Sequence, residues 1–371
     1  MYSESDLAAA VEAGVLSPDA ANAFRNHVAE AREAPAVDEE HFKLLTGFND
    51  IFVAIAAALV LAAVAWLGAD LAKMLLNEQH ESPRLIGGLM MGGSLSVAAA
   101  SWLLAEYFTR RRRMALPSIL LLLAFVGGAF GSFAGMFVIN APWIEATFGL
   151  RGEMAHRQAG GVILALIGVA TAIATYVHWR RFMVPITVAA GAMALVGIAI
   201  GIIVAVVPGA ENWLYWMALV AGLIVFAFAM RWDMSDLERR TRRSDVAFWL
   251  HLLAAPLIAH PVFHLIGVFD GDIPIAMAAV VIILYVGFAS VALAVDRRAL
   301  LVSSLVYVLY ALYAIFAQTG AVELSAALTA LVIGSALLTL SAFWQPMRRG
   351  VVGLLGGLET RLPPVQQPAL A

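Results

Sequence analysis

The sequence contains no cysteine and only a small share of charged residues. Of its 371 residues, 13% are charged and 62% are hydrophobic, whereas an average soluble domain is about 25% charged and about 45–50% apolar. The absence of cysteine excludes disulfides, thiolate metal ligands and cysteine nucleophiles. The apolar residues fall into separate blocks of membrane-spanning length, which excludes an unusually apolar soluble core. These features predict an all-α, polytopic membrane helix bundle.

Motifs that would assign a chemistry are also absent. The sequence has no P-loop, no Gly-x-Ser-x-Gly and no His-Glu-x-x-His, so ATP-driven transport and membrane proteolysis have no support. No predicted span carries a central Asp, Glu, Lys or Arg, which argues against a conventional proton- or sodium-coupled antiporter. No catalytic set is visible, so an enzyme is the less favoured interpretation, and we assign no catalytic, cofactor-binding or metal-binding residue.

From Phe48 onward the apolar blocks predict ten transmembrane helices. Each has close to the roughly 20 residues that a spanning helix needs, and short connections should make consecutive helices antiparallel neighbours. The spans cover approximately 48–68, 85–108, 115–138, 159–178, 182–207, 213–231, 246–268, 273–295, 299–317 and 322–344. The predicted domains are therefore a hairpin and linker over 1–40, a ten-span domain over 41–346, and an amphipathic segment with a tail over 347–371.

The distribution of basic residues predicts the orientation. With the N-terminus in the cytoplasm, 19 of the 23 basic residues fall in cytoplasmic segments, and only Lys73, Arg84, Arg151 and Arg157 lie outside. This asymmetry follows the positive-inside rule, and an even number of spans places both termini in the cytoplasm. No apolar segment typical of a cleavable signal peptide lies near the N-terminus, so we expect the first span to direct insertion.

Residues 3–33 predict two short helices joined by a turn. Gly14 ends the first, and Ser17-Pro18 supplies a cap and a first-turn proline for the second. A hairpin that reads DNA would carry a basic face, but the first 47 residues hold nine acidic and three basic side chains. We therefore expect no nucleic-acid partner and interpret the hairpin as an element that docks a cytoplasmic protein or acts as a lid. Its expected interface consists of Leu7, Ala10, Val11, Val15 and Leu16 against Ala21, Phe24 and Val28.

Glycines recur at a spacing of four in several spans. This spacing allows helices to approach closely in lipid, so we interpret these residues as packing positions and not as the lining of a pore. The residues concerned are Gly88 and Gly92, then Gly127, Gly131 and Gly135, and finally Gly197 and Gly201.

The segment 245–268, DVAFWLHLLAAPLIAHPVFHLIGV, carries three histidines and two prolines within an apolar span. His260 and His264 are four residues apart and share a helix face. An ideal helix would place His251 on the opposite side, but Pro256 and Pro261 disturb this geometry, so the prediction covers the near pair alone. Pro256 and Pro261 each remove a backbone donor and free a carbonyl four residues earlier. Because lipid cannot bond those carbonyls, we expect this helix to pack inside the bundle or to border a wet cavity. Ionisable residues in a span indicate a functional site by default.

Three interpretations of the histidines stay open. In the first, each is neutral and fixes helix packing by bonding a neighbouring carbonyl. In the second, His260 and His264 line a polar cavity and serve a proton-linked or anion-binding step. In the third, the pair is half of a metal or haem site. Haem is disfavoured because His178, the other histidine associated with a span, lies at the opposite end of the membrane.

Polar residues outside the spans could form an outer vestibule beside the histidine pair. The alternative is a solvated loop with ordinary ion pairs, which we favour. The vestibule candidates lie around the external loop before the fourth span, and directly after the histidine span: Asn140, Glu145, His156 and Asp270.

Three stretches carry a resemblance to a known family. They are DLAAAVEAGVLSPDAANAF at 6–24, the first span ending in Ala65-Trp66-Leu67-Gly68, and FWLHLLAAPLIAHPVF at 248–263. With them the chain resembles the bacterial membrane proteins grouped as domain-of-unknown-function family 2157. The resemblance implies a short N-terminal helical segment before a multi-helix membrane domain, in a bacterial inner membrane. It implies no activity and no catalytic residue.

Two functions fit the sequence. The favoured one is a carrier or permease for a small solute or lipid, whose path includes His251, Pro256, His260, Pro261 and His264. The alternative is a non-transporting scaffold or sensor whose N-terminal hairpin binds a cytoplasmic partner. The two differ in what a deletion of residues 1–40 should do, because a carrier would keep its flux and a scaffold would lose its role.

Overall fold

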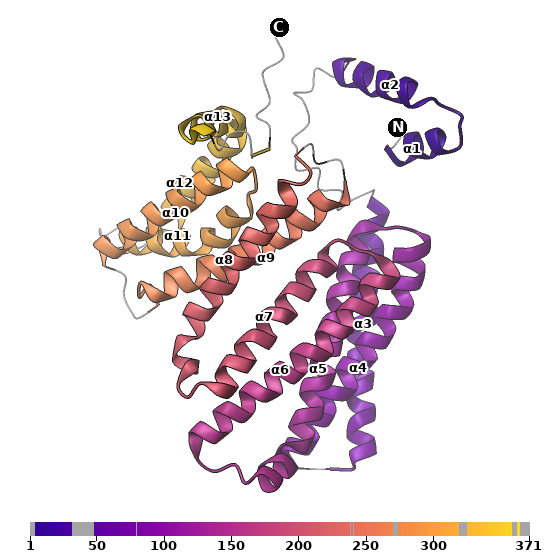
Figure 1. Ribbon diagram of the computed structural model, residues 1–371, viewed down its shortest axis with the longest axis vertical. Helices are drawn as coiled ribbons and strands as arrows, with labels where there is room; N and C mark the ends of the chain where they lie inside the picture. Colours follow the sequence, from indigo (N-terminus) through magenta and orange to yellow (C-terminus); the bar gives the residue numbers. More distant parts are fainter. Residues whose placement is uncertain are drawn as a thin grey trace. The chain divides into compact units, whose positions relative to one another are not determined.

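The structure is a computed structural model that describes residues 4–31, 48–78, 80–237, 239, 241–269, 274–318, 325–357 and 362–363. Within these ranges every regular element is a helix and no strand occurs, which confirms the predicted all-α class (Figure 1). The chain divides into two compact units, Met1–Lys43 and Leu44–Ala371. We call them the hairpin unit and the membrane unit and describe each separately.

The hairpin unit contains the two expected helices, α1 (Glu4–Glu12) and α2 (Pro18–Ala31). Gly14 lies between them at a φ of +70°, which a side chain would disfavour. The hydroxyl of Ser17 accepts a hydrogen bond of 3.1 Å from the backbone N–H of Ala20, so Ser17 caps α2 as its sequence predicts. Leu7 and Ala21 are buried.

Two hydrophobic residues of the hairpin unit do not lie where we expected them. Val15 is 77% exposed and Phe24 is 44% exposed, so the prediction that both are buried in the hairpin interface is wrong. Val15 lies in the turn between α1 and α2, and Phe24 lies in α2, of which only one face can contact α1. The unit therefore presents apolar side chains to its surroundings.

The membrane unit contains nine helices that are long and apolar enough to cross a membrane, within the described part of the chain. The protein is accordingly a membrane protein. A tenth apolar helix, α12, qualifies only together with α13, to which it is bent by 76°. The bounds are α3 Phe48–Leu76, α4 Pro83–Ala105, α5 Ala115–Phe148, α6 Gly152–Phe182, α7 Ile186–Val206, α8 Leu214–Asp233, α9 Arg242–Leu265, α10 Ile275–Val295, α11 Ala299–Gln318, α12 Ser325–Ala342 and α13 Trp344–Leu354.

Several helices run past their predicted ends. Helix α5 continues to Phe148 through Pro142, where we predicted an end near residue 138, and α6 begins already at Gly152. The predicted long external loop is therefore wrong, because almost all of it is helical. The end of α4 passes into a short π-helix, η1 (Glu106–Arg111). The predicted amphipathic segment begins earlier than residue 347, since α13 starts at Trp344.

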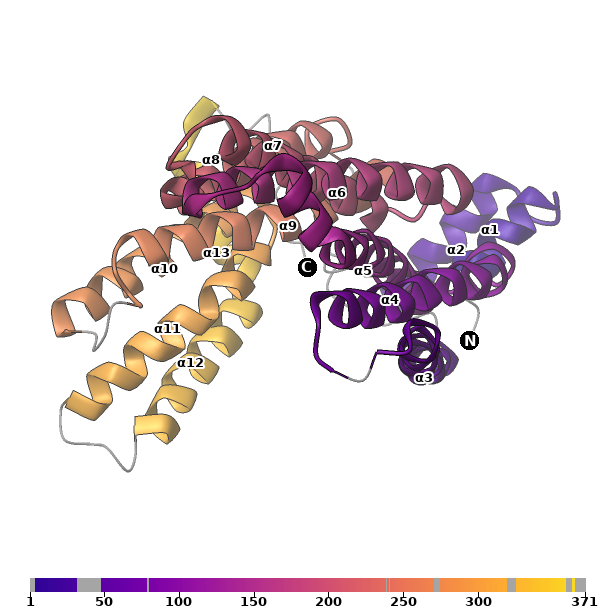
Figure 2. The same ribbon diagram turned by 90° about the horizontal axis from the view of Figure 1, so that it is seen from below.

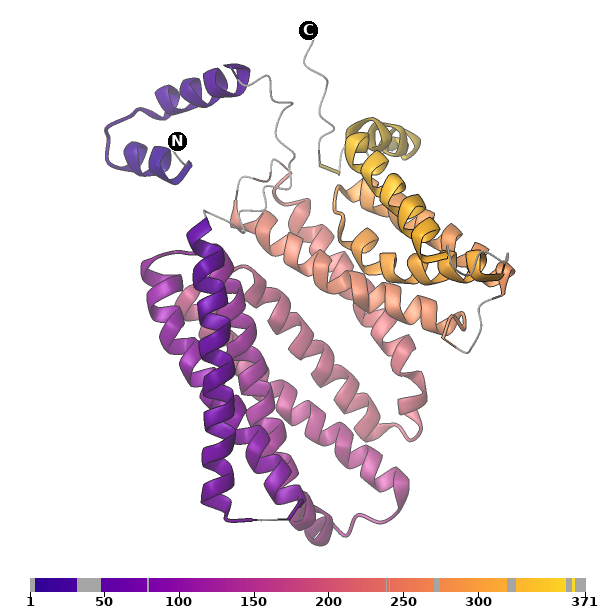
Figure 3. The same cartoon turned by 180° about the vertical axis from the view of Figure 1, so that it is seen from behind.

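Helix α9, which holds the three histidines, lies at the centre of the membrane unit. It packs against α7, α8 and α11, and its most apolar window is 56% buried, the largest share among the candidate spans. Figures 2 and 3 show α10, α11 and α12 on one side of α9 and α3, α4 and α5 on the other. The prediction that this helix packs inside the bundle is confirmed, and packing from three sides explains how it tolerates its prolines.

Close glycine contacts hold neighbouring helices together. A Cβ at Gly201 in α7 would lie 2.7 Å from backbone atoms of α6, and one at Gly222 in α8 would lie 2.8 Å from the carbonyl carbon of Leu257 in α9. Gly88, Gly92, Gly131 and Gly135 also meet a neighbouring helix, whereas Gly127 and Gly197 face open space. The predicted packing role is thus confirmed for five of the seven glycines and wrong for two.

Candidate functional site

Helix α9 stays helical from Arg242 to Leu265 through both prolines. Its sides differ sharply. Pro256 and His260, four residues apart, are exposed, whereas His251 and Pro261 are buried. Because residues four apart share one face of a helix, α9 has an open face with Pro256 and His260 and a closed face with His251.

The open face ends in a cluster of aromatic and imidazole rings, which we call the histidine–tyrosine cluster. Nδ1 of His260 and the hydroxyl of Tyr307 in α11 share a hydrogen bond of 2.7 Å. The ring of His264 stacks on Tyr215 in α8, with centroids 3.5 Å apart and planes 18° from parallel. Phe269 lies 5.7 Å from the His260 ring and 5.9 Å from the His264 ring, measured between centroids. Three helices therefore supply one small site.

The histidine–tyrosine cluster keeps hydrogen-bonding capacity. Within the described residues, no hydrogen bond occupies Nε2 of His260 or either nitrogen of His264. A neutral imidazole offers one donor and one acceptor nitrogen. The cluster can therefore bond a polar group while its rings contact an apolar or planar one. No set of three or more His, Asp and Glu side chains that could hold a metal ion occurs within the described ranges.

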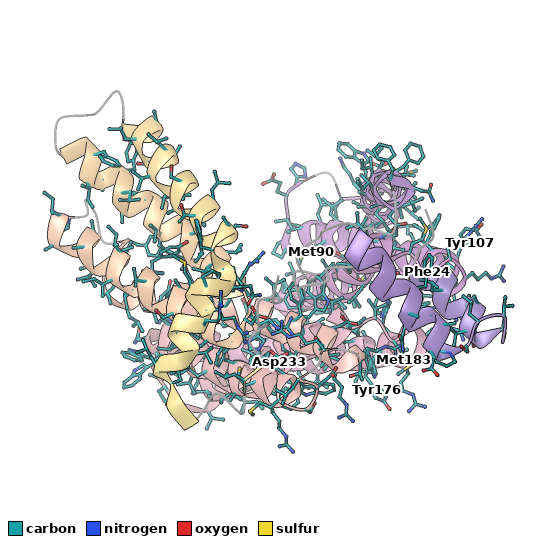
Figure 4. The ribbon with its side chains drawn as sticks, turned by 90° about the horizontal axis from the view of Figure 1, so that it is seen from above. Phe24, Met90, Tyr107, Tyr176, Met183 and Asp233 are labelled. Atoms are coloured by element: carbon teal, nitrogen blue, oxygen red, sulfur yellow. The ribbon has the colours of Figure 1, made fainter. Side chains whose placement is uncertain are left out.

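The closed face of α9 holds a buried ion cluster that we did not foresee. His251 donates a hydrogen bond of 2.9 Å from Nε2 to Oδ2 of Asp233, the last residue of α8. Arg297, in the connection between α10 and α11, donates to both oxygens of the same carboxylate at 2.6 and 3.2 Å. The side chains of Asp233, His251 and Arg297 are each at most 5% exposed. Figure 4 shows Asp233 inside the bundle, whereas Tyr107 and Tyr176 lie at its periphery.

A second carboxylate, that of Asp296, lies next to Arg297 in the chain and extends this ion cluster. It accepts a bond of 2.9 Å from Arg239 and one of 2.7 Å from Nε1 of Trp344 in α13. Arg348, also in α13, approaches it to 3.6 Å and donates a bond of 2.6 Å to the carbonyl of Pro363. Together with the bonds from Arg297 to Asp233, these bonds join the end of α8, the turn between α10 and α11, and α13.

The ion cluster accounts for His251 structurally. A buried carboxylate is stable only when donors surround it, and His251 supplies one of the three donated bonds to Asp233. His251 therefore orients helices and has no part in the histidine–tyrosine cluster. In the sequence, charged residues lie at the ends of predicted spans, where charges are expected at the membrane interface and help to set the orientation. These residues are Asp233, Asp296 and Arg297. The one local signal for the cluster was His251, an imidazole within an apolar span that needs a partner.

The predicted outer vestibule is assembled only in part. Glu145 and His156 approach each other to 3.7 Å on α5 and α6, and both are exposed. The amide of Asn140 instead donates a bond of 2.7 Å to the carbonyl of Met136 in its own helix. Asp270 lies outside the described residues. Within those residues no hydrogen bond or ion pair connects Asn140, Glu145 or His156 to the histidine–tyrosine cluster, so an ordinary exposed ion pair describes this region better.

Comparison with family models, with curated proteins and with solved structures gave no match. The resemblance to family 2157 therefore stays a prediction. A function for this chain has to be argued from the chemistry of the histidine–tyrosine cluster and of the ion cluster.

Proposed function

We propose that this protein is a carrier, or a permease-like protein, that binds a small solute or a lipid at the histidine–tyrosine cluster in a bacterial inner membrane. The observation that carries the proposal is the exposure of His260. This histidine lies on the open face of the most buried helix, and its Nδ1 is fixed by Tyr307. A polar side chain exposed at membrane depth is costly, and such residues usually face a substrate path or a wet cavity.

The geometry of the cluster favours a ligand with a polar group and an apolar part. Nε2 of His260 and the nitrogens of His264, to which no described residue is hydrogen-bonded, can bond a hydroxyl, amide, carboxylate or phosphate group. The rings of Tyr215, Phe269 and Tyr307 would contact hydrocarbon or a planar group. Small solutes of this kind and lipid headgroups share that chemistry.

The proposed orientation places both termini in the cytoplasm. The support is the charge asymmetry of the sequence, in which 19 of 23 basic residues fall on one side. In this orientation His260 and His264 lie in the outer half of the membrane. The ion cluster of Asp233 and Arg297 lies at the cytoplasmic end, because α8 ends there and α9 and α11 begin there.

A ligand screen by thermal shift tests the proposal. Detergent-purified wild type and His260→Ala/His264→Ala would be melted with lipids and small solutes from about pH 5.5 to about 8.5, which covers the titration range of histidine. A ligand that binds the folded state raises the melting temperature by mass action. We expect a ligand-specific shift in wild type that the double variant loses. His156→Ala, which changes an exposed histidine outside the cluster, is the matched control and should keep it. Equal responses of all three proteins would contradict the proposal.

A scaffold or sensor is the second candidate, and one observation favours it. The acidic hairpin unit exposes two apolar side chains, Val15 and Phe24, which a cytoplasmic protein could contact. Deletion of residues 1–40 separates the two functions. A carrier should keep the ligand-induced shift after the deletion, whereas a scaffold should show no such shift before it and should lose its partner after it.

A further inference from the structure

A second polar site lies in the other half of the membrane unit, on α6. His178 is 1% exposed, and neither of its ring nitrogens has a hydrogen-bond partner among the described residues. A buried polar group without a partner costs about 1–3 kcal/mol. In a membrane the surrounding lipid cannot supply the missing bond. The burial of His178 therefore needs a chemical explanation.

Aromatic rings surround His178 but cannot satisfy it. Trp102 of α4, Phe125 of α5 and Phe182 of α6 lie with their ring centroids 6.1, 5.4 and 4.6 Å from that of the imidazole. An aromatic face can accept a weak bond from the ring N–H. A neutral imidazole also has an acceptor nitrogen; the phenylalanine rings have no donor, and the indole N–H of Trp102 makes no hydrogen bond to either nitrogen of His178. The missing partner is thus a hydrogen-bond donor.

Two further buried hydroxyl groups, one in α6 and one after the end of α4, lack a hydrogen-bond partner among the described residues. Thr171, seven residues before His178 on the same face of α6, is buried and its hydroxyl also lacks a partner within the described residues. The end of α4 that follows Trp102 is the π-helix η1, in which the hydroxyl of Thr109 is likewise buried and unpartnered there. Short π-helical segments often mark functional sites.

We propose that the face of α6 with Thr171 and His178 binds a neutral hydrogen-bond donor, either water or the hydroxyl or amide group of a small uncharged solute. The ligand donates to the acceptor nitrogen of His178. No acidic or basic side chain pairs with His178 in the described part of the chain, so nothing there would balance a charged ligand. This site is separate from the histidine–tyrosine cluster and does not depend on the carrier function.

X-ray radiolytic labelling of the full-length chain in lipid nanodiscs tests the site. Bound water yields hydroxyl radicals in place and oxidises adjacent rings. We expect Phe125 and Phe182 to incorporate oxygen from isotope-labelled water, and this label to fall at least threefold in His178→Phe. Leu250, which is fully buried within an apolar cluster, serves as the internal control and should stay unlabelled. Thr171→Val provides a second variant if His178→Phe fails to fold, and it should also lower the label.

A parallel arm distinguishes the two sources of the donor. Denatured wild type would be extracted and analysed by mass spectrometry for a neutral compound with a hydroxyl or amide group. A compound that co-purifies with wild type and not with His178→Phe supports a solute, and labelling without such a compound supports water. The proposal is overturned if wild type shows neither, or if both signals persist unchanged in His178→Phe and in Thr171→Val.

Discussion

Neutralising Asp233 is the change that the membrane unit should tolerate least. Asp233→Asn keeps the shape of the side chain and removes the charge that accepts bonds from His251 and from both donor groups of Arg297. Breaking a buried ion pair by removing one partner costs about 3–5 kcal/mol, because the other charge stays buried without compensation. Unfolding entropy grows with size, so each kcal/mol lowers the melting temperature of a unit as large as Leu44–Ala371 by about 1–2 °C. We therefore expect Asp233→Asn to lower the melting temperature by about 3–10 °C.

The assay is thermal unfolding in detergent, followed by tryptophan fluorescence. Asp70→Asn is the matched control, because Asp70 is an exposed carboxylate in α3, and it should leave the melting temperature within about 1–2 °C of wild type. Arg297→Leu should cost less in an Asp233→Leu background than in wild type, since residues in one network are not additive. A melting temperature for Asp233→Asn close to that of wild type would refute the view that this cluster stabilises the fold.

Three further predictions concern packing, the C-terminal helix and topology. Gly222→Ala should destabilise the protein by about 1–3 kcal/mol in the same thermal assay, because its methyl group would lie 2.8 Å from the carbonyl carbon of Leu257. Gly197→Ala is the control; its methyl group would meet nothing within 4 Å, so it should be neutral or stabilising. Trp344→Phe removes the donor to Asp296 and should cost about 1–3 kcal/mol, whereas Trp213→Phe, at a 64% exposed position, should change little. Because the chain has no cysteine, Ser235→Cys and Asn212→Cys each create a unique site for a thiol label. Impermeant reagents should reach the cysteine at position 235 only from the cytoplasm and the cysteine at position 212 only from outside. Labelling of both from one side would contradict the proposed topology.

Local sequence patterns predicted the features of the fold that depend on local chemistry. The cap at Ser17 and the proline after it place the start of α2. The histidines and prolines of α9, which lipid could not satisfy, indicated a helix enclosed by others. Both inferences rest on backbone hydrogen bonds that must be satisfied within a few residues or by the nearest helix.

Features that depend on distant residues could not be read in this way. Asp233 and Arg297 are 64 positions apart, and no local sequence pattern indicates that the end of α8 would contact the connection between α10 and α11. Asn140 and Pro142 resemble signals for the end of a helix, yet α5 continues through them. The side-chain amide of Asn140 donates a hydrogen bond to the carbonyl of Met136 in the same helix, so Asn140 is compatible with the continuing helix. The glycine spacing likewise could not show that Gly127 and Gly197 face away from their neighbours.

The three histidines of α9 illustrate both what the sequence predicts and what it does not. The spacing of four predicted that His260 and His264 share a face, and the structure confirms this, with the two ring centroids 6.3 Å apart. The sequence did not distinguish a packing histidine from an exposed one. That distinction came from the partners, which are Asp233 for His251, Tyr307 for His260 and Tyr215 for His264.

The proposed carrier requires that His260 be reached from water, and cysteine modification measures this directly. His260→Cys in the otherwise cysteine-free chain would be treated in sealed membranes with an impermeant thiol reagent and, separately, with a lipid-soluble one. Ala259→Cys, at a fully buried position one residue away, is the control and should react with neither. We expect the impermeant reagent to modify residue 260. Modification by the lipid-soluble reagent alone would place His260 against lipid and contradict a substrate path on this face of α9.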